Sequence, residues 1–238
     1  IVERMAIRPG DILGIGIDGQ SWSAIPVSRE RGALHSTPIW MVTRCEQICA
    51  EYRRALGERR VFEVCGNPLM PSYTLPKVIW FKREVPEVYA AADAILQSNG
   101  YIAYKLTGEF TQDMSQGYGW HCFDMRRGKW DRALAAEFGI DARLLPDIVP
   151  CDRVIGRVSA QAALESGLCE GTPVVAGGLD AACGTLGAGV IAPDQTQEQG
   201  GQAGGMSICL SEYVADPRLI MSWHVIPDRW LLQGGTVG

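Results

Sequence analysis

Several patterns are missing from the sequence of 238 residues, and each absence excludes a class of protein. It has no stretch of about 18 apolar residues and no recognisable signal peptide, so we expect a soluble, cytoplasmic protein. No long basic block accompanies the net charge of −5, which argues against nucleic acid or an anionic membrane as the main partner. No G-K-[ST] follows a glycine-rich run, which excludes a Walker A loop.

The cysteines and histidines also lack a metal-binding pattern. The eight cysteines contain no C-x-x-C pair, so a zinc ribbon or a thioredoxin-type motif has no support. Cys45 and Cys49 are spaced to share a metal, but no His or second pair lies at ligand spacing, and small apolar packing is the favoured interpretation. We expect reduced, mostly buried thiols. His35, His121 and His224 lie far apart in the sequence and are expected to be structural.

What is present predicts a globular α/β protein. Hydrophobic residues make up 47% and charged residues 21% of the chain, values typical of a globular protein. A capping-box pattern of Thr43 and Glu46 predicts a helix that ends at Gly57, and three prolines within 65–77 predict a surface loop. The other predicted elements are a strand over 11–19 and helices over 86–96, 130–138 and 159–165.

One acidic residue stands within the apolar and small residues of TPVVAGGLDAACGTLGAGV, residues 172–190. The pattern predicts a buried strand over 174–176, a turn at 177–178 and a helix over 181–186. Asp180 would then stand at the mouth of a strand-turn-helix unit, where open α/β sheets bind ligands. The alternative is that Asp180 only caps the helix. This stretch alone leaves both interpretations open.

A domain boundary is predicted near 168–172, where GLCEGTP separates a helix from the strand of that stretch. Residues 1–170 would form one domain and 171–238 the start of a second, with Asp180 at the cleft between them. A glycine-rich run at 199–207, QGGQAGGMS, follows Asp180. Its backbone N–H groups could approach a phosphate closely, although such runs are more often ordinary turns.

Several motifs occur in an order that resembles a known family. They are GIDGQ, PIW..TR, GNPLMPSYTLPKVIWFKREVPEVY, YKLTGEFTQDMS, VIGRVSAQAALESGL and GTPVVAGGLDAACGTLGAGV, with a glycine-rich turn after them. Together they resemble the FGGY carbohydrate kinases, and the xylulokinase branch in particular, from about residue 10 to residue 238. The resemblance implies two actin-like (ribonuclease H-like) α/β domains around a cleft. The first would bind mainly the sugar and the second mainly ATP with Mg²⁺.

The resemblance also implies roles for particular residues. Asp180 matches the aspartate of the family's G-G-x-D motif, the general base that accepts the proton of a sugar hydroxyl during phosphoryl transfer. No residue is assigned as a metal ligand. The residues that would contact the sugar are Gln20, Ser21, Trp22, Arg44 and Ala181, and those that would lie near the ATP phosphates are Gly201, Gln202, Ala203 and Gly204.

The sequence departs from the xylulokinase pattern at some of these positions. Relatives read Gly-Gln-Met-His at 19–22, with the Met and the His touching the sugar, whereas this chain has Ser21 and Trp22. Trp22 can stack on a sugar face or serve as a core aromatic, but it cannot reproduce imidazole hydrogen bonds. Val42 replaces an acid, and the sequence Gly-Gln-Ala-Gly at 201–204 replaces a Gly-Thr-Ser-Gly phosphate turn and so loses two hydroxyls.

The chain also covers only part of the family's pattern. It lacks the early Asp-x-Gly-Thr phosphate element and the adenosine-binding half, so we expect a fragment that is weak or inactive alone. The favoured function is ATP-dependent phosphorylation of a sugar or polyol, with a pentulose such as xylulose preferred. The alternatives are a catalytically degenerate sugar-binding or regulatory protein of the same fold and, less favoured, an actin-like or chaperone-type ATPase. A homodimer is compatible with the sequence.

Overall fold

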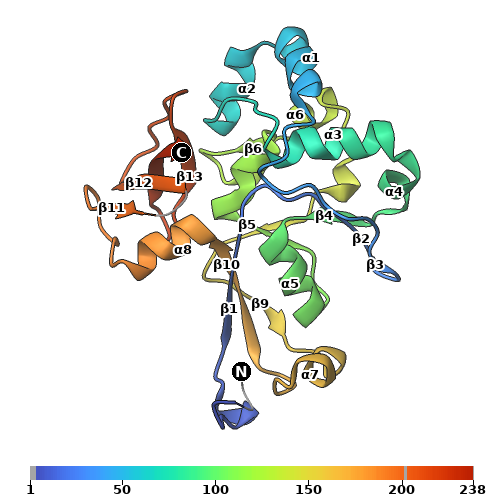
Figure 1. The fold of residues 1–238 in the computed structure, drawn as a ribbon, viewed down its shortest axis with the longest axis vertical. Helices are drawn as coiled ribbons and strands as arrows, with labels where there is room; N and C mark the ends of the chain where they lie inside the picture. Colours follow the sequence, from blue (N-terminus) through green and yellow to red (C-terminus); the bar gives the residue numbers. More distant parts are fainter. Residues whose placement is uncertain (1–3, 201–202, 238) are drawn as a thin grey trace.

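The computed structural model describes residues 4–200 and 203–237 and shows the expected mixed α/β architecture (Figure 1). None of its helices in these two ranges is long and apolar enough to cross a membrane. The helices are α1 (Glu46–Leu56), α2 (Glu58–Cys65), α3 (Thr74–Glu84), α4 (Pro86–Ala91), α5 (Ser98–Thr107), α6 (Arg132–Glu137), α7 (Ala160–Ser166) and α8 (Asp180–Gly187), with 3-10 helices at Pro9–Asp11, Met114–Trp120 and Ala142–Leu144.

The strands form several small sheets. The strands are β1 (Ile15–Gly19), β2 (Ile25–Ser28), β3 (Gly32–Ala33), β4 (Ala94–Leu96), β5 (Thr111–Asp113), β6 (Phe123–Asp124), β7 (Lys129–Trp130), β8 (Asp147–Val149), β9 (Val154–Arg157), β10 (Pro173–Leu179), β11 (Thr196–Gln199), β12 (Ala203–Leu210), β13 (Ile220–Trp223) and β14 (Trp230–Val237). The central sheet has the order β1-β10-β9, in which β1 and β10 are parallel, and a C-terminal sheet has the order β11-β12-β14-β13.

The strand β10 continues through two glycines that were predicted to form a turn. Gly177 and Gly178 both lie inside β10, and the pairing register with β1 shifts between Gly16 and Asp18. Gly177 has a φ of +68°, and a Cβ there would lie 1.7 Å from the carbonyl oxygen of Ile17. The predicted turn is therefore wrong. Glycine here allows a left-handed residue and a close approach of two strands within a continuous sheet.

Two other predicted elements end at different residues in the structure. The loop predicted over 65–77 ends at Tyr73, because Pro76 falls in the first turn of α3, where a missing N–H costs little. The helix predicted over 86–96 ends at Ala91, and residues 94–96 form the fully buried strand β4, which pairs with β2. Burial in a sheet overrides the helical pattern there.

The capping box is also wrong, because α1 begins at Glu46 with Cys45 as its N-cap, and Thr43 contributes only its carbonyl, to the Glu46 N–H. By contrast, Ser159 caps α7 and accepts a hydrogen bond from the Ala162 N–H at 3.2 Å, and α7 ends at Ser166 with Gly167 as its C-cap, in agreement with the predicted stop at Gly167. The predicted strand over 11–19 and the predicted helix over 130–138 are shorter in the structure.

A helical layer covers the upper part of the molecule in Figure 1. The helices α1, α2, α3, α4 and α6 surround one apolar cluster, which includes Cys45 and Cys49 at 0% exposure. Burial raises the pKa of these two thiols to about 11 and about 12. Six of the eight cysteines are buried and all eight are free, so the predicted burial of most thiols is confirmed.

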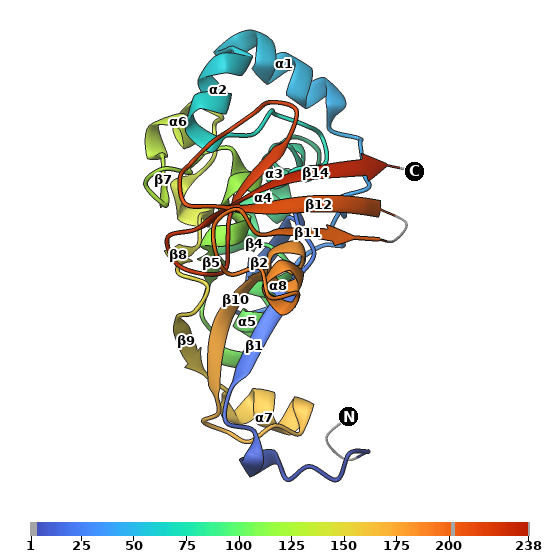
Figure 2. The same cartoon turned by 90° about the vertical axis from the view of Figure 1, so that its left-hand side faces the viewer.

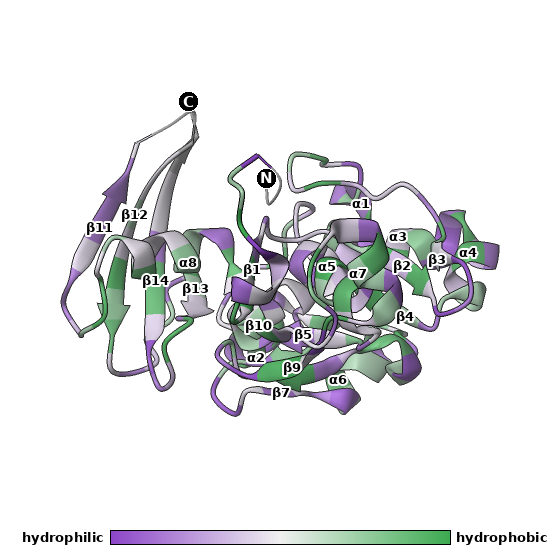
Figure 3. Cartoon of the chain, turned by 90° about the horizontal axis from the view of Figure 1, so that it is seen from below, coloured by the Kyte–Doolittle hydropathy of each residue, from purple (hydrophilic) through white to green (hydrophobic). Residues whose placement is uncertain are grey.

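The C-terminal sheet stands beside the rest of the molecule, with α8 between them (Figure 3), and in Figure 2 this sheet lies toward the viewer. It is attached through buried contacts. The Asn67 side chain donates to the Met221 carbonyl at 2.8 Å and accepts from the Met221 N–H at 3.0 Å, and Trp223 donates to the Met125 carbonyl at 3.0 Å. The proposed boundary between 170 and 171 stays a prediction, and the central sheet spans it through β10.

We predict that Gly177→Ala lowers the free energy of unfolding by about 2–5 kcal/mol, the sum of the left-handed penalty and the strain of overpacking. Gly171→Ala is the matched control, because Gly171 has a φ of +83° but nothing within 4 Å of an added Cβ. It should cost only about 1–2 kcal/mol. Urea denaturation measures both variants, and equal losses would contradict the close approach at Gly177.

Candidate active site

Two carboxylates lie at one edge of the central sheet. The parallel pairing of β1 with β10 places Asp18 opposite Gly178 and Gly19 opposite Leu179. Asp180 follows as the first residue of α8, and both aspartates are exposed. Because open α/β sheets bind ligands at the carboxyl ends of their strands, this edge is the candidate active site.

The Asp180 carboxylate makes one local hydrogen bond. Its Oδ1 accepts from the Ala181 N–H at 2.7 Å. The N-cap position itself is occupied by Leu179, whose apolar side chain accepts no hydrogen bond, so Asp180 does not have the usual capping geometry. Partial desolvation raises the pKa of Asp180, the Ala181 N–H lowers it, and the negative charge of Asp18 raises it again. A raised pKa makes this carboxylate a stronger proton acceptor.

A buried chain of hydrogen bonds holds the junction between β10 and α8. Asp113, 3% exposed at the end of β5, accepts from Ser115 Oγ at 2.5 Å, and Ser115 Oγ accepts from the Leu179 N–H at 2.8 Å. Burial raises the pKa of Asp113, and hydrogen bonds from Asn99 and Ser115 lower it. This chain fixes the backbone one residue before Asp180, so the position of the candidate base depends on β5.

Residues 20–22 leave the sheet at the same edge because they follow β1 directly. We call them the substrate loop because the sequence predicts that they contact the sugar. Ser98 Oγ donates to the Gln20 carbonyl at 2.7 Å. The Trp22 N–H donates to Gln97 Oε1 at 3.0 Å, and Trp22 has a φ of +67°. The backbone at Gln20 and Trp22, on either side of Ser21, is therefore held by hydrogen bonds next to the candidate active site.

Trp22 packs into a cluster of aromatic rings. Its ring centroid lies 4.3 Å from that of Tyr73 and 6.1 Å from that of Tyr118. Gly119 allows this packing, since a Cβ there would lie 2.9 Å from Trp22 Cδ1. Burial raises the pKa of Tyr118, Trp22 and Ser21 oppose this, and the charge of Asp180 adds to it. The half-buried Trp22 is thus part of the core, and contact with a sugar stays a prediction.

Arg44 and Ala181 complete the predicted sugar contacts. Arg44 is exposed, and its guanidinium lies over the Trp80 ring at 4.9 Å from the centroid. Ala181 is half-buried beside Asp180, and its carbonyl accepts from Thr185 Oγ1 at 2.8 Å. Ala181 therefore lies at the candidate active site, whereas Arg44 packs on Trp80 of α3.

Two residues of the predicted phosphate turn lie in a strand. Ala203 and Gly204 belong to β12 and pair with Val237 and Thr236 of β14, which corrects their assignment to a loop. A pattern of glycines does not distinguish a tight turn from a glycine-containing strand that pairs with another such strand. Gly201 and Gln202 lie outside the described residues, and phosphate binding by this segment stays a prediction.

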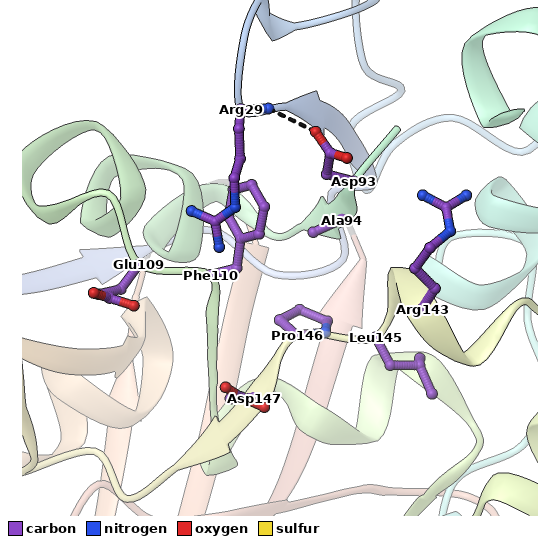
Figure 4. Close-up of a pocket in the computed structure, with 9 residues that line it drawn as sticks. All are labelled: Arg29, Asp93, Ala94, Glu109, Phe110, Arg143, Leu145, Pro146 and Asp147. Atoms are coloured by element: carbon purple, nitrogen blue, oxygen red, sulfur yellow. Dashed lines mark hydrogen bonds between the residues drawn. The ribbon is translucent and has the colours of Figure 1, made fainter. Parts of the chain in front are cut away.

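A separate cleft has a volume of about 340 Å³ (Figure 4). Arg29 lies on one side, where its guanidinium stacks over Phe110 at 4.1 Å from the centroid and donates to the Gly108 carbonyl at 2.9 Å. None of the predicted site residues lines this cleft. The lining residues are Arg29, Asp93, Ala94, Glu109, Phe110, Arg143, Leu145, Pro146 and Asp147.

Sequence reasoning missed several polar residues around the candidate active site. Asp18, Asp113 and Ser115 support or tune Asp180, and Lys77 contacts the substrate loop. The available signal was their place within motifs such as GIDGQ, TLPK and TQDMS. Over 4–200 and 203–237, no group of three or more His, Cys, Asp or Glu side chains is arranged to hold a metal ion.

Residues 1–187 match the N-terminal domain of the FGGY family of carbohydrate kinases. The chain belongs to this family. It is 28% identical over 224 residues to the xylulose kinase of Escherichia coli K12, a match covering 93% of this chain and 46% of that protein. The resemblance inferred from the motifs is therefore confirmed, and the chain spans about half the length of such relatives.

Solved structures of the family agree with the fold. The xylulose kinase of Rhodospirillum rubrum is 27% identical with a TM-score of 0.89, and the match covers 94% of this chain and 46% of that one. The glycerol kinase of Plasmodium falciparum, solved with ADP, is 18% identical with a TM-score of 0.84, over 93% and 46% of the two chains. The second similarity supports the fold alone.

We predict that Asp18→Asn lowers the pKa of Asp180, because it removes a neighbouring negative charge that disfavours ionisation. The pKa should stay above its ordinary value, since desolvation is the larger cause. Titration of the side-chain carboxyl carbon by NMR measures this directly. Asp152→Asn, at another exposed aspartate, is the control, and an unchanged Asp180 titration in Asp18→Asn would contradict electrostatic coupling of the two carboxylates.

Proposed function

We propose that the whole protein transfers the γ-phosphoryl group of ATP to a hydroxyl of a sugar or polyol, with Asp180 as the general base. The observation that carries this proposal is an exposed carboxylate with a raised pKa at the carboxyl edge of β1 and β10, beside the substrate loop. The hydroxyl would give its proton to Asp180 as its oxygen bonds to the γ-phosphorus and the bond to the β-phosphate oxygen breaks, releasing ADP.

The favoured substrate is a pentulose such as xylulose. Membership of the FGGY family and the similarity to xylulose kinases support this choice. Trp22 argues for a sugar that presents an apolar face at this position, because an indole stacks on such a face and offers only one donor. Gln20, Ser21, Arg44 and Ala181 are the other residues proposed to contact the sugar.

ATP and Mg²⁺ complete the proposal. Membership of the FGGY family of carbohydrate kinases supports ATP as the phosphoryl donor, and a glycerol kinase of the same fold was solved with ADP. Mg²⁺ would neutralise charge on the phosphates and needs few protein ligands because the phosphates supply most of its binding. The segment 201–204 is proposed to lie near those phosphates, in a cytoplasmic enzyme that acts on small molecules.

A catalytically degenerate sugar-binding protein is the second candidate. Gly204 lies within a strand, and the segment 201–204 carries no hydroxyl side chain, both of which weaken a phosphate-binding role. The two candidates differ in turnover. A panel of pentuloses, pentitols and glycerol with ATP and Mg²⁺, assayed on the full-length protein, distinguishes them, since binding without ADP release would support the second candidate.

We expect Asp180→Asn to lower kcat by about 10²–10⁴-fold, because an amide cannot accept the hydroxyl proton. The melting temperature should change little, since Asn is similar in size and its oxygen can still accept from the Ala181 N–H. Steady-state kinetics and thermal unfolding of the full-length protein measure both. Asp152→Asn is the matched control, and near-normal turnover of Asp180→Asn would exclude Asp180 as the base.

For Trp22→Ala we expect the KM for the sugar to rise much more than the KM for ATP, because only the sugar loses a contact surface. The variant should also be less stable, since the Trp22 ring packs on Tyr73 and Tyr118. Kinetics with each substrate varied in turn provide the comparison. A stability loss with an unchanged sugar KM would assign Trp22 to the core alone.

A further inference from the structure

Lys77 is a lysine of α3 with 0% exposure. Its Nζ donates to the Trp22 carbonyl at 2.7 Å and to the Ser72 carbonyl at 2.6 Å, and no ion pair to a carboxylate is found for it within the described residues. Burial lowers the pKa of Lys77 to about 8, with a small opposite effect from Cys45. A buried ammonium is costly compared with an apolar side chain. Its two acceptors, the carbonyls of Trp22 and Ser72, therefore indicate which backbone segments it stabilises.

The Trp22 carbonyl belongs to a residue with an unfavourable backbone conformation. A tryptophan in the left-handed region, here with φ +67°, costs about 1–3 kcal/mol and persists only where its surroundings impose it. Gln97 fixes the N–H of Trp22, and Lys77 fixes its carbonyl. Thr74, also from α3, donates to the next carbonyl, that of Ser23, at 3.2 Å. The irregular backbone is thus restrained on both sides by buried polar groups.

An ammonium suits this task because it places more than one donor on a single atom. Lys77 Nζ joins the substrate loop to Ser72, two residues before the start of α3. A methionine would fill the same space but would leave both carbonyls without a donor. A glutamine keeps donors but has a shorter side chain. The length and the charge of lysine both matter for joining these segments.

We propose that Lys77 is a positioning residue that fixes the substrate loop, through the Trp22 carbonyl, in the conformation that binds the sugar. This inference rests on the proposed function, because the loop is a sugar contact only if the protein is a sugar or polyol kinase. Lys77 itself does not touch the reacting atoms. Its loss should therefore weaken sugar binding without affecting the phosphoryl transfer step or ATP binding directly.

The test compares Lys77→Met with Lys82→Met in the full-length protein. Lys82 is a matched control, because it is an exposed lysine of the same helix that also donates to a backbone carbonyl, that of Gly139. Amide hydrogen exchange at Trp22 reports on the loop without any substrate, and KM values for sugar and ATP report on binding. Lys77→Gln is the second variant if Lys77→Met does not fold.

We expect Lys77→Met to speed exchange at Trp22 and to raise the sugar KM by about tenfold or more, the effect of losing one charge-assisted hydrogen bond. The KM for ATP should stay within about twofold, and Lys82→Met should match the wild type in every measurement. Unchanged exchange at Trp22 would overturn the inference. Faster exchange with an unchanged sugar KM would also overturn it, because Lys77 would then be purely structural.

Failure of the proposed function gives a different result. If the wild-type protein phosphorylates no sugar or polyol of the panel, the kinase proposal fails and the part of the inference that concerns sugar binding fails with it. The exchange rates of Trp22 in wild type, Lys77→Met and Lys82→Met still decide whether Lys77 holds the loop. Faster exchange in Lys77→Met alone supports that contact, and equal rates exclude it.

Discussion

The parallel pairing of β1 with β10 is the constraint on which the candidate active site depends. Both strands end at the same sheet edge, so Asp18, the substrate loop and Asp180 come together although more than 150 residues separate the strands. The close approach of Gly177 to the Ile17 carbonyl makes this pairing possible. Any side chain at 177 would push the two strands apart and separate the carboxylate from the loop.

Buried polar groups hold the irregular backbone around this edge. Asp113 reaches the Leu179 N–H through Ser115, Gln97 holds the Trp22 N–H, and Lys77 holds the Trp22 carbonyl. Each is at most 3% exposed, and buried polar groups are costly unless their partners are in place. The apolar clusters stabilise the layers, whereas these hydrogen bonds determine where the loop and the candidate base lie.

Membership of the FGGY family and the fold agree with each other, and the chain spans about half of its relatives. The chain contains the residues proposed to contact the sugar. The segment proposed to lie near the ATP phosphates adjoins the C-terminal sheet, in which β12 pairs along its length with β14. The edge carrying Asp180 lies where α8 joins this sheet to the rest of the molecule (Figure 1).

The sequence alone determined the family, the α/β class, the burial of most cysteines and the helix predicted over 159–165, which the structure places at 160–166. These features follow from motifs, composition and local capping residues, which can be recognised without knowledge of distant contacts. The end of the helix after Pro86, the continuation of β10 through its glycines and the strand at Ala203 depended on pairing with distant strands, which local patterns do not encode. The sequence likewise indicated Asp180 but not its partners. Only the tertiary structure brought Asp18, Asp113 and Lys77 to the site, since their roles arise from hydrogen bonds and charges between segments far apart in the chain.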